Sequence, residues 1–295
     1  MNRTADLLTL SPTPPTALLG SSAEQVSDGL LSRYADLIYA RTGIRVSPQK
    51  KALLSNRLRR RLRSTGIAGF DKYYDHLKAL SPRDPEWDAF LQEITTHETY
   101  LFRDMAQWDW LRSVFLPSLA ASPRPGVLRI WSAACSTGDE AFTAACCVAA
   151  ALPEHGKWKV QIVGSDIGIG AVEQARTGTF GDRAMRLVSE SYRRCYFAKA
   201  RDAQVWQAKP ALADMTSFKQ HNLLEPISEK PFHLVFLKNV LIYFDRPSKK
   251  RVMANVERAI VPGGYLIAGA AEGVSDLVGD LTRIEPWLYQ RKGIY

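Results

Sequence analysis

Hydrophobic residues recur every three or four positions through the first third of the chain, which is the spacing of one face of a helix. The pattern predicts four short helices. The apolar positions are Leu30, Leu31, Tyr34, Leu37 and Ile38, then Leu54, Leu58 and Leu62, then Phe70, Tyr73, Tyr74 and Leu77, and finally Trp87, Phe90, Leu91 and Ile94. Gly43 and Gly66 end the first two helices, and Ser47-Pro48 opens the second. We expect a small helical bundle over residues 24–94.

From about residue 127 the pattern changes, because buried β-rich runs alternate with helical spacing as in an α/β sheet. The predicted strands are residues 127–131, 160–166, 233–239 and 265–270. Helices are expected after Gly138, over 170–178 and over 247–260. The fold class is therefore α/β, with a helical bundle in front of it.

Composition and charge indicate which partners and which cellular compartment to expect. Residues 1–23 are rich in Thr, Ser and Pro and are predicted to form a flexible leader. Lys and Arg number 39 against 30 Asp and Glu, a net charge of +9 that favours an acidic partner without choosing between nucleic acid, anionic lipid and protein. The four cysteines show no paired spacing, so neither a disulfide framework nor a metal site is predicted. We expect a cytoplasmic protein with no signal peptide and no membrane insertion.

The loop of residues 132–140, SAACSTGDE, lies between a predicted strand and a predicted helix, where α/β folds bind ligands. It is neither a Walker loop nor a three-glycine dinucleotide motif. The next predicted strand ends in Asp166, an acid placed to accept hydrogen bonds from ribose hydroxyls. Together they indicate an adenosine-bearing ligand. A tight turn of small residues and a helix cap remain the structural alternatives.

Two further segments carry polar groups. Residues 239–245, NVLIYFD, follow a buried strand, so Asn239 and Tyr243 are expected at the same sheet edge, although a half-buried tyrosine is the plain alternative. Residues 95–104, TTHETYLFRD, join the bundle to the sheet domain. Their aromatic residues indicate that this junction is packed and is not a free linker.

In this order the segments resemble the CheR family of chemoreceptor glutamate methyltransferases. TTHETYLFR is similar to the family's TTNxTxFFR, WSAACSTGDEAF to WSAAxSTGEEPYS, and GSDIG to its SDID strand end. HNLL resembles the NLL segment, LKNVLIYFD resembles CRNVxIYFD, and PGGYLIAGAAE resembles the glycine turn and GHSE strand. The resemblance spans roughly residues 27–290, nearly the whole chain.

The resemblance implies a Rossmann-like methyltransferase domain over residues 111–295, a junction over 95–110 and a small inserted β-subdomain at about 190–220. It also implies S-adenosylmethionine as cofactor, S-adenosylhomocysteine as product, and glutamyl methyl esters formed on chemoreceptors for sensory adaptation. The cofactor contacts it implies are His97, Thr99, Arg103, Glu140, Asp166, Asn222, Leu223, Lys238 and Asn239. Arg103 and Tyr243 would lie next to the reacting carboxylate.

Four positions depart from the family pattern. His97 replaces an asparagine, Gly168 an aspartate, Lys238 an arginine and Ala270 a histidine. A lysine lacks the two-pronged guanidinium of arginine, so Lys238 is a poorer clamp for a carboxylate. A nucleic-acid methyltransferase and a non-catalytic relative that binds cofactor or receptor stay open as alternatives.

The second predicted helix carries seven Lys and Arg between residues 50 and 63 and no acid. Its leucine stripe turns Arg59, Arg60 and Arg63 away from the bundle core, so we expect them to dock the acidic helical cytoplasmic domain of a chemoreceptor. Nucleic acid is not the expected partner. Residues 192–218 contain no glycine, which disfavours a tight hairpin. We therefore expect no tether to a receptor's C-terminal peptide, with a turn at Arg201-Asp202-Ala203 as the alternative.

Overall fold

The computed structural model describes residues 25–121, 126–152, 158–199, 204–269 and 271–293. The predicted leader, the predicted turn at 201–203 and Ala270 lie outside these residues. No helix in the described ranges is long and apolar enough to cross a bilayer.

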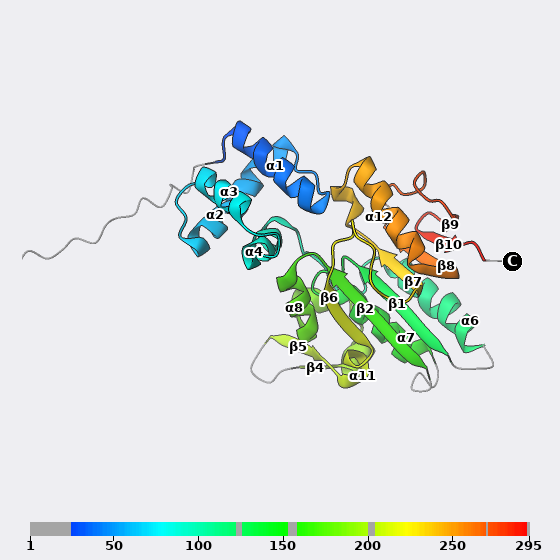
Figure 1. Ribbon diagram of the computed structural model, residues 1–295. Helices are drawn as coiled ribbons and strands as arrows, with labels where there is room; N and C mark the ends of the chain where they lie inside the picture. Colours follow the sequence, from blue (N-terminus) through cyan, green and yellow to red (C-terminus); the bar gives the residue numbers. More distant parts are fainter. Residues whose placement is uncertain (1–24, 122–125, 153–157, 200–203, 270, 294–295) are drawn as a thin grey trace, which may run out of the picture.

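Four helices form the N-terminal unit, as the hydrophobic spacing predicts (Figure 1). They are α1 (Asp28–Thr42), α2 (Lys51–Thr65), α3 (Phe70–Ala79) and α4 (Pro85–Ile94), with a 3-10 turn η1 (Pro48–Lys50) before α2. Gly43 and Gly66 follow α1 and α2 with φ of 71° and 72°, left-handed values that glycine adopts without steric cost. The leucine stripe of α2 packs into a core shared by all four helices.

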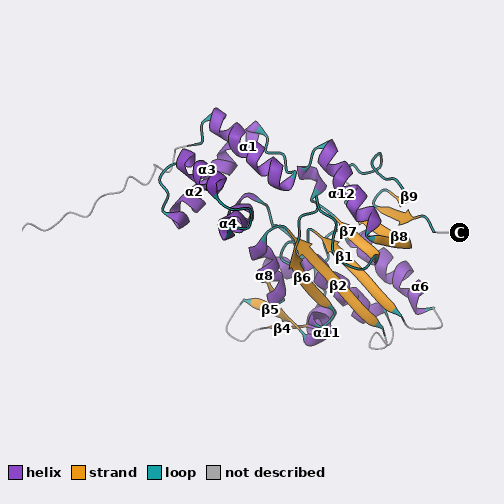
Figure 2. Ribbon diagram, viewed as in Figure 1, coloured by secondary structure: helices purple, strands orange, loops and turns teal. Residues whose placement is uncertain are grey.

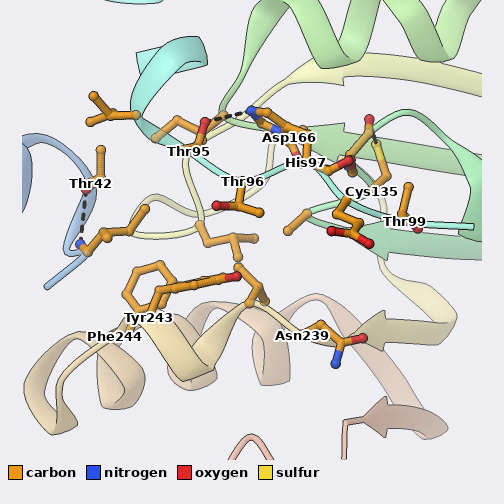
Figure 3. Close-up of a pocket in the computed structure, with 18 of the residues that line it drawn as sticks. Thr42, Thr95, Thr96, His97, Thr99, Cys135, Asp166, Asn239, Tyr243 and Phe244 are labelled. Carbon is orange, nitrogen blue, oxygen red and sulfur yellow. Dashed lines mark hydrogen bonds and ion pairs between the residues drawn. The ribbon is translucent and has the colours of Figure 1, made fainter. Parts of the chain in front are cut away.

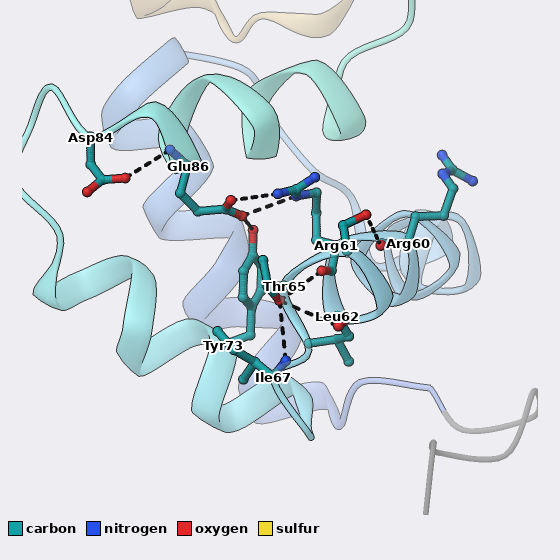
Figure 4. Close-up of polar contacts among 9 residues, drawn as sticks. Arg60, Arg61, Leu62, Thr65, Ile67, Tyr73, Asp84 and Glu86 are labelled. Atoms are coloured by element: carbon teal, nitrogen blue, oxygen red, sulfur yellow. Dashed lines mark hydrogen bonds and ion pairs between the residues drawn. The ribbon is translucent and has the colours of Figure 1, made fainter. Parts of the chain in front are cut away.

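A polar network fixes the orientation of α2 within this unit (Figure 4). The guanidinium of Arg61 donates to both carboxylate oxygens of Glu86 on α4, at 2.5 and 3.1 Å. The hydroxyl of Tyr73 donates to Glu86 at 2.5 Å, and burial raises the pKa of that phenol. Because the two ends of the pair come from different helices, the network holds α2 against α3 and α4.

The second unit is built on a seven-stranded sheet in the order β6-β2-β1-β7-β8-β10-β9 (Figure 2). The strands are β1 (Val127–Ala133), β2 (Lys159–Asp166), β6 (Thr216–Gln220), β7 (Phe232–Leu237), β8 (Ile260–Ala268), β9 (Leu281–Glu285) and β10 (Leu288–Arg291). β6, β2, β1, β7 and β8 run parallel, and β10 pairs antiparallel with β8 and β9. The predicted strands are confirmed, although the third ends at Leu237.

Helices cover both faces of this sheet. One face packs on α7 (Asp139–Ala151) and on the segment of α5 (Met105–Trp110), the π-helical η2 (Leu111–Phe115) and α6 (Leu116–Ala120). The other packs on α12 (Arg246–Arg258) through Val252, Met253 and Val256. The helix α8 (Ile169–Thr177) contacts β2 and β6, and also α4 of the N-terminal unit.

The small inserted sheet differs in position from the prediction of residues 190–220. Its strands are β3 (Thr179–Gly181), β5 (Val205–Ala208) and β4 (Phe197–Lys199), in the order β3-β5-β4. It therefore begins earlier, and β6 belongs to the main sheet because it pairs with β2 from Ile162 to Asp166. Sequence spacing missed β3 because a three-residue strand carries almost no alternation. The short helices α9 (Asp182–Met185), α10 (Glu190–Tyr196) and α11 (Pro210–Ala213) surround this subdomain.

Candidate active site

A cleft of about 1370 Å³, counting its open mouth, lies where the carboxyl ends of β1, β2 and β7 face the N-terminal unit. The strand order reverses between β1 and β7, the position at which open α/β sheets bind ligands. The cleft collects predicted residues from the junction and from the sheet domain: His97, Thr99, Arg103, Glu140, Asp166, Asn222, Leu223, Lys238, Asn239 and Tyr243.

Asp166 holds the loop that follows β1. Its Oδ2 accepts the backbone N–H of Ser136 at 2.8 Å, and its Oδ1 accepts that of Gly168 at 2.9 Å. Ser136 has φ of 51° and Ala134 has φ of 62°, strained values for residues with a side chain. The hydroxyl of Ser136 donates to the carbonyl of His97 at 2.7 Å, which ties the loop to the junction. The carboxylate is thus fixed before any ligand arrives.

Glu140 and Lys238 form a buried charged group beside Asp166. The hydroxyl of Ser132 donates to Glu140 at 2.7 Å, and Lys238 Nζ lies 3.6 Å from the other carboxylate oxygen. Lys238 also contacts Asp104 Oδ2 at 3.2 Å and donates to the carbonyl of Arg103 at 3.3 Å. Burial raises the pKa of Glu140, and Lys238 and Ser132 oppose this. Lys238 therefore neutralises protein carboxylates and braces the junction.

His97 lies against Asp166 from the junction (Figure 3). Its Nε2 is 2.6 Å from the hydroxyl of Thr95, and its Nδ1 is 3.5 Å from Asp166 Oδ1. Burial lowers the pKa of the imidazole, although the charge of Asp166 acts in the opposite direction. At neutral pH the ring is therefore uncharged.

Asn222 and Leu223 reach the cleft from the segment after β6. The amide of Asn222 donates to the carbonyl of Arg41 at 2.8 Å and accepts the N–H of Leu224 at 3.1 Å, so it bridges the two units. Leu223 is buried. Together they give the cleft a wall that is partly apolar and suits a flat ring.

Arg103 and Tyr243 line the same cleft from two distant segments of the chain, the junction and the turn that follows β7. The guanidinium of Arg103 stacks 5.6 Å from the Tyr100 ring, and no acid among the described residues pairs with it. Tyr243 ends the 3-10 turn η4 (Leu241–Tyr243), and Lys50 Nζ lies 5.2 Å from its ring centre. Figure 3 shows Tyr243 across the cleft from His97 and Asp166. The mouth of the cleft is therefore cationic and aromatic.

Sequence reasoning missed Glu272. This residue is fully buried, and its Oε1 accepts the N–H of Val240 at 3.2 Å. It therefore supports the turn that carries Asn239, whose φ is 58°. Burial raises the pKa of Glu272, while the backbone N–H groups of residues 239–241 lower it. Glu272 is the last residue of PGGYLIAGAAE, the segment that resembles the family's GHSE strand, so that resemblance could have indicated it.

The predicted docking residues lie on α2 and outside the lining of the cleft. Arg60 pairs with Glu93 on α4 at 2.6 Å, and Arg59 contacts Asn56. Lys51 pairs with Asp28, and Arg61 with Glu86. Acids from α1 and α4 therefore neutralise part of this basic run within the N-terminal unit, and docking of a receptor by Arg59, Arg60 and Arg63 stays a prediction. Arg63 is exposed, with no ion pair among the described residues.

The fold and the cleft define a protein that binds an adenosine-bearing cofactor. Asp166 keeps acceptor capacity for a ribose diol, since two backbone N–H groups use only half of its lone pairs. Gly138 has φ of 89°, and a Cβ there would lie 2.9 Å from the side chain of Ala175, so the loop is shaped around glycine. No group of three His, Cys, Asp or Glu that could hold a metal occurs within the described part of the chain.

Two family models match the chain. Residues 30–95 match the all-alpha domain of CheR methyltransferase, and residues 97–286 match its SAM binding domain. The chemotaxis protein methyltransferase of Salmonella typhimurium is 33% identical, with 92% of this chain and 93% of that protein covered. The Escherichia coli protein of the same name is 33% identical, with coverage of 90% and 92%. The chain belongs to the CheR methyltransferase family, and its cofactor is S-adenosylmethionine.

Two further matches, one in sequence and one in structure, are weaker. The chemotaxis protein methyltransferase of Borreliella burgdorferi is 31% identical over 83% of this chain and 88% of that protein. Among solved structures, the N-methyltransferase NodS from Bradyrhizobium japonicum gives a TM-score of 0.35 at 15% identity, covering 64% of this chain and 99% of that chain.

Proposed function

We propose that this methyltransferase esterifies glutamate side chains on the cytoplasmic helical domains of chemoreceptors, and that it acts in the cytoplasm. The observation that carries the proposal is the guanidinium of Arg103, which faces the cleft without an acidic partner among the described residues while Lys238 holds Glu140 and Asp104. An available cation beside the cofactor site suits an anionic acceptor. Relatives named chemotaxis protein methyltransferases support the same assignment.

Methyl transfer to a carboxylate requires no proton transfer by the protein. A glutamate is already a carboxylate at pH 7, so it needs no general base. When bound, S-adenosylmethionine supplies an electrophilic sulfonium methyl group, and transfer to a carboxylate oxygen leaves S-adenosylhomocysteine with no proton to move. Of the residues present, Asp166 suits the ribose, Glu140 the methionine end, and Leu223 with Asn222 the adenine. Their preset hydrogen bonds keep the orientation cost low.

Arg103 is proposed to orient one oxygen of the acceptor while the other attacks. Charge on the carboxylate falls in the transition state, so a tight grip on both oxygens would stabilise the ground state and slow the reaction. Positioning is therefore the more effective use of the guanidinium. Tyr243 closes the opposite side and offers a hydroxyl or a wall that excludes water.

Radiolabelled methyl transfer to purified receptor cytoplasmic fragments tests the proposal. We expect label on the fragments that is released as methanol by mild base, as an ester requires, and no label on fragments with the accepting glutamates changed to alanine. Arg103→Ala should lower transfer far more than cofactor affinity, and Arg103→Lys should recover part of it. Tyr243→Phe separates a hydroxyl role from packing. Label on nucleic acid, or cofactor binding without transfer to any fragment, would overturn the proposal.

A further inference from the structure

His97 and Gly168, two of the positions that depart from the family pattern, occupy one space beside Asp166. A Cβ built on Gly168 would lie 2.5 Å from Gln92 Oε1, 2.6 Å from His97 Cε1 and 2.7 Å from His97 Nε2, so both side chains would have to move. The backbone of Gly168 has φ of −80° and ψ of 110°, which any residue can adopt. The neighbouring side chains of Gln92 and His97, and not the backbone conformation, therefore favour glycine here.

The hydrogen bonds of Thr95 define where the proton sits on His97. The Thr95 hydroxyl donates its one hydrogen to the carbonyl of Leu91 at 2.6 Å. At the 2.6 Å contact with His97 Nε2, the imidazole nitrogen must then be the donor. In the neutral ring the proton is on Nε2, and Nδ1 presents a lone pair to Asp166 Oδ1 at 3.5 Å.

Counting acceptors on Asp166 shows what a second proton would change. A carboxylate has about four lone-pair positions, and the N–H groups of Ser136 and Gly168 take one on each oxygen. One position per oxygen remains, which is what the two hydroxyls of a ribose require. A proton on His97 Nδ1 would occupy the remaining position on Oδ1 and leave one hydroxyl without its acceptor.

We propose that His97 is a positioning residue for Asp166 that controls, through protonation of Nδ1, how many acceptors Asp166 offers to the cofactor ribose, and that Gly168 is its packing partner. The proposal rests on the assignment of Asp166 to the ribose. It makes the two departures one linked change in this chain.

The charged and polar groups around His97 come from three elements. Asp166 at the end of β2 favours the protonated ring, whereas Arg57 on α2 disfavours it. Gln92 on α4 is uncharged, and its Oε1 lies 2.5 Å from the position of the same Gly168 Cβ. Burial is the largest effect and lowers the pKa of His97 below its ordinary 6.5. The ring is therefore neutral at pH 7–8 and gains its proton only in acid.

The first test is the pH dependence of S-adenosylhomocysteine binding, measured by calorimetry on the full chain between pH 5.5 and 8. Affinity should fall as the pH drops below 6.5, approaching a loss of about tenfold for one hydrogen bond to a charged group. In His97→Asn the pH slope should be smaller by the contribution of His97. His221 also lines the cleft, but it is present in both proteins and cancels. An equal pH slope in both proteins would overturn the proposal.

The second test is a double-mutant cycle on the same affinity. In a Gln92→Ala background, which removes the nearest contact, Gly168→Ala should weaken binding by about tenfold or more, and by much less once His97→Ala is added. Gly170→Ala is the matched control, because the three nearest atoms to its Cβ all belong to Gln92. Its effect should add to that of His97→Ala. Additive behaviour of the Gly168 pair would refute the packing partnership, and should Gly168→Ala fail to fold, the pH comparison decides alone.

Asp166→Ala separates failure of this inference from failure of the ribose assignment. Unchanged affinity in Asp166→Ala would remove the ribose assignment itself. A large loss there, with an unaltered pH slope in His97→Asn, would leave the assignment in place and refute the role of His97.

Discussion

Replacing Lys238 by methionine tests whether its ammonium is the counter-charge that makes the cleft stable. The side chain is 3% exposed and reaches Glu140, Asp104 and the carbonyl of Arg103. Methionine keeps the length and volume of lysine but carries no charge. Glu140, 14% exposed, would retain only the hydroxyl of Ser132.

Removing one partner of a buried ion pair costs about 3–5 kcal/mol, because the other charge stays buried. Asp104 is 44% exposed and can rehydrate, so Glu140 dominates and we expect the lower end, about 3 kcal/mol. For a chain of this size that is a fall in Tm of roughly 5 °C. Lys238 now opposes the burial that raises the pKa of Glu140, so its loss raises that pKa further. A carboxyl with a raised folded pKa destabilises at high pH and recovers as pH falls through that pKa. The deficit should therefore be larger at pH 8 than at pH 5.5.

Urea unfolding followed by tryptophan fluorescence measures this, since Lys238 Nζ lies 5.2 Å from the ring of the buried Trp108. The double variant Lys238→Met/Glu140→Gln is the control and should be more stable than Lys238→Met alone. A deficit under about 1 kcal/mol, the value of an exposed pair, or a deficit equal at both pH values, would refute the buried-charge argument.

Asp166→Ala should weaken S-adenosylhomocysteine binding by at least about tenfold in calorimetry. Thermal melting should show a loss of about 1–3 kcal/mol in stability, since two loop N–H groups lose their acceptor. A fully stable variant would contradict the loop contacts. Arg59 and Arg63 changed to Glu should slow receptor methylation and flatten its salt dependence without altering cofactor affinity, whereas Arg60→Glu should also destabilise α2 by repelling Glu93; unchanged turnover at low salt would exclude α2 as the docking helix. Receptor C-terminal peptides should show no micromolar binding that maps to residues 192–218, as titration of the full chain can determine.

The expectation that no receptor peptide binds at residues 192–218 has to be weighed against β4, an edge strand of the small sheet. β4 pairs with β5 on one side only, and Lys199 opposite Trp206 leaves six residues between them in place of a two-residue turn. The absence of glycine thus disfavoured a tight hairpin but did not argue against a sheet. Backbone donors at an edge can add a peptide strand whatever the turn. The titration is therefore the deciding measurement.

The helices and central strands could be predicted because burial imposes a period on the sequence. α1 to α4 each bury one stripe, and β7 is buried along nearly its whole length. β9 buries only Leu281, so it shows no alternation to detect. The π-helical segment Leu111–Phe115 has ordinary helical spacing, since one wider turn changes hydrogen bonds and leaves the apolar pattern intact.

Some site residues could be predicted from their position in the fold, whereas others depend on contacts between segments that are far apart in the sequence. Asp166 and Glu140 stand at strand ends and helix starts, places where position alone indicates a ligand. Glu272 was missed because its importance comes from the turn at residues 239–241, more than thirty positions away in sequence. The pairing of Arg60 with Glu93 was missed for the same reason. A charge run in sequence shows which charges exist and leaves open which of them are already neutralised.

The buried side chains of Asp166, Glu272 and Lys238 each hold a segment of strained backbone. The non-glycine residues of positive φ among those described are Phe102, Asp104, Ala134, Ser136 and Asn239. Such residues cost about 1–3 kcal/mol each unless their surroundings hold them. Each strained segment is held by one buried ionisable group. Asp166 binds the loop of Ser136, Glu272 the turn after Asn239, and Lys238 the junction around Asp104. Because the three segments also line the cleft, the groups that stabilise the backbone are those that shape the cofactor site, and a substitution at any of them should change stability and affinity together.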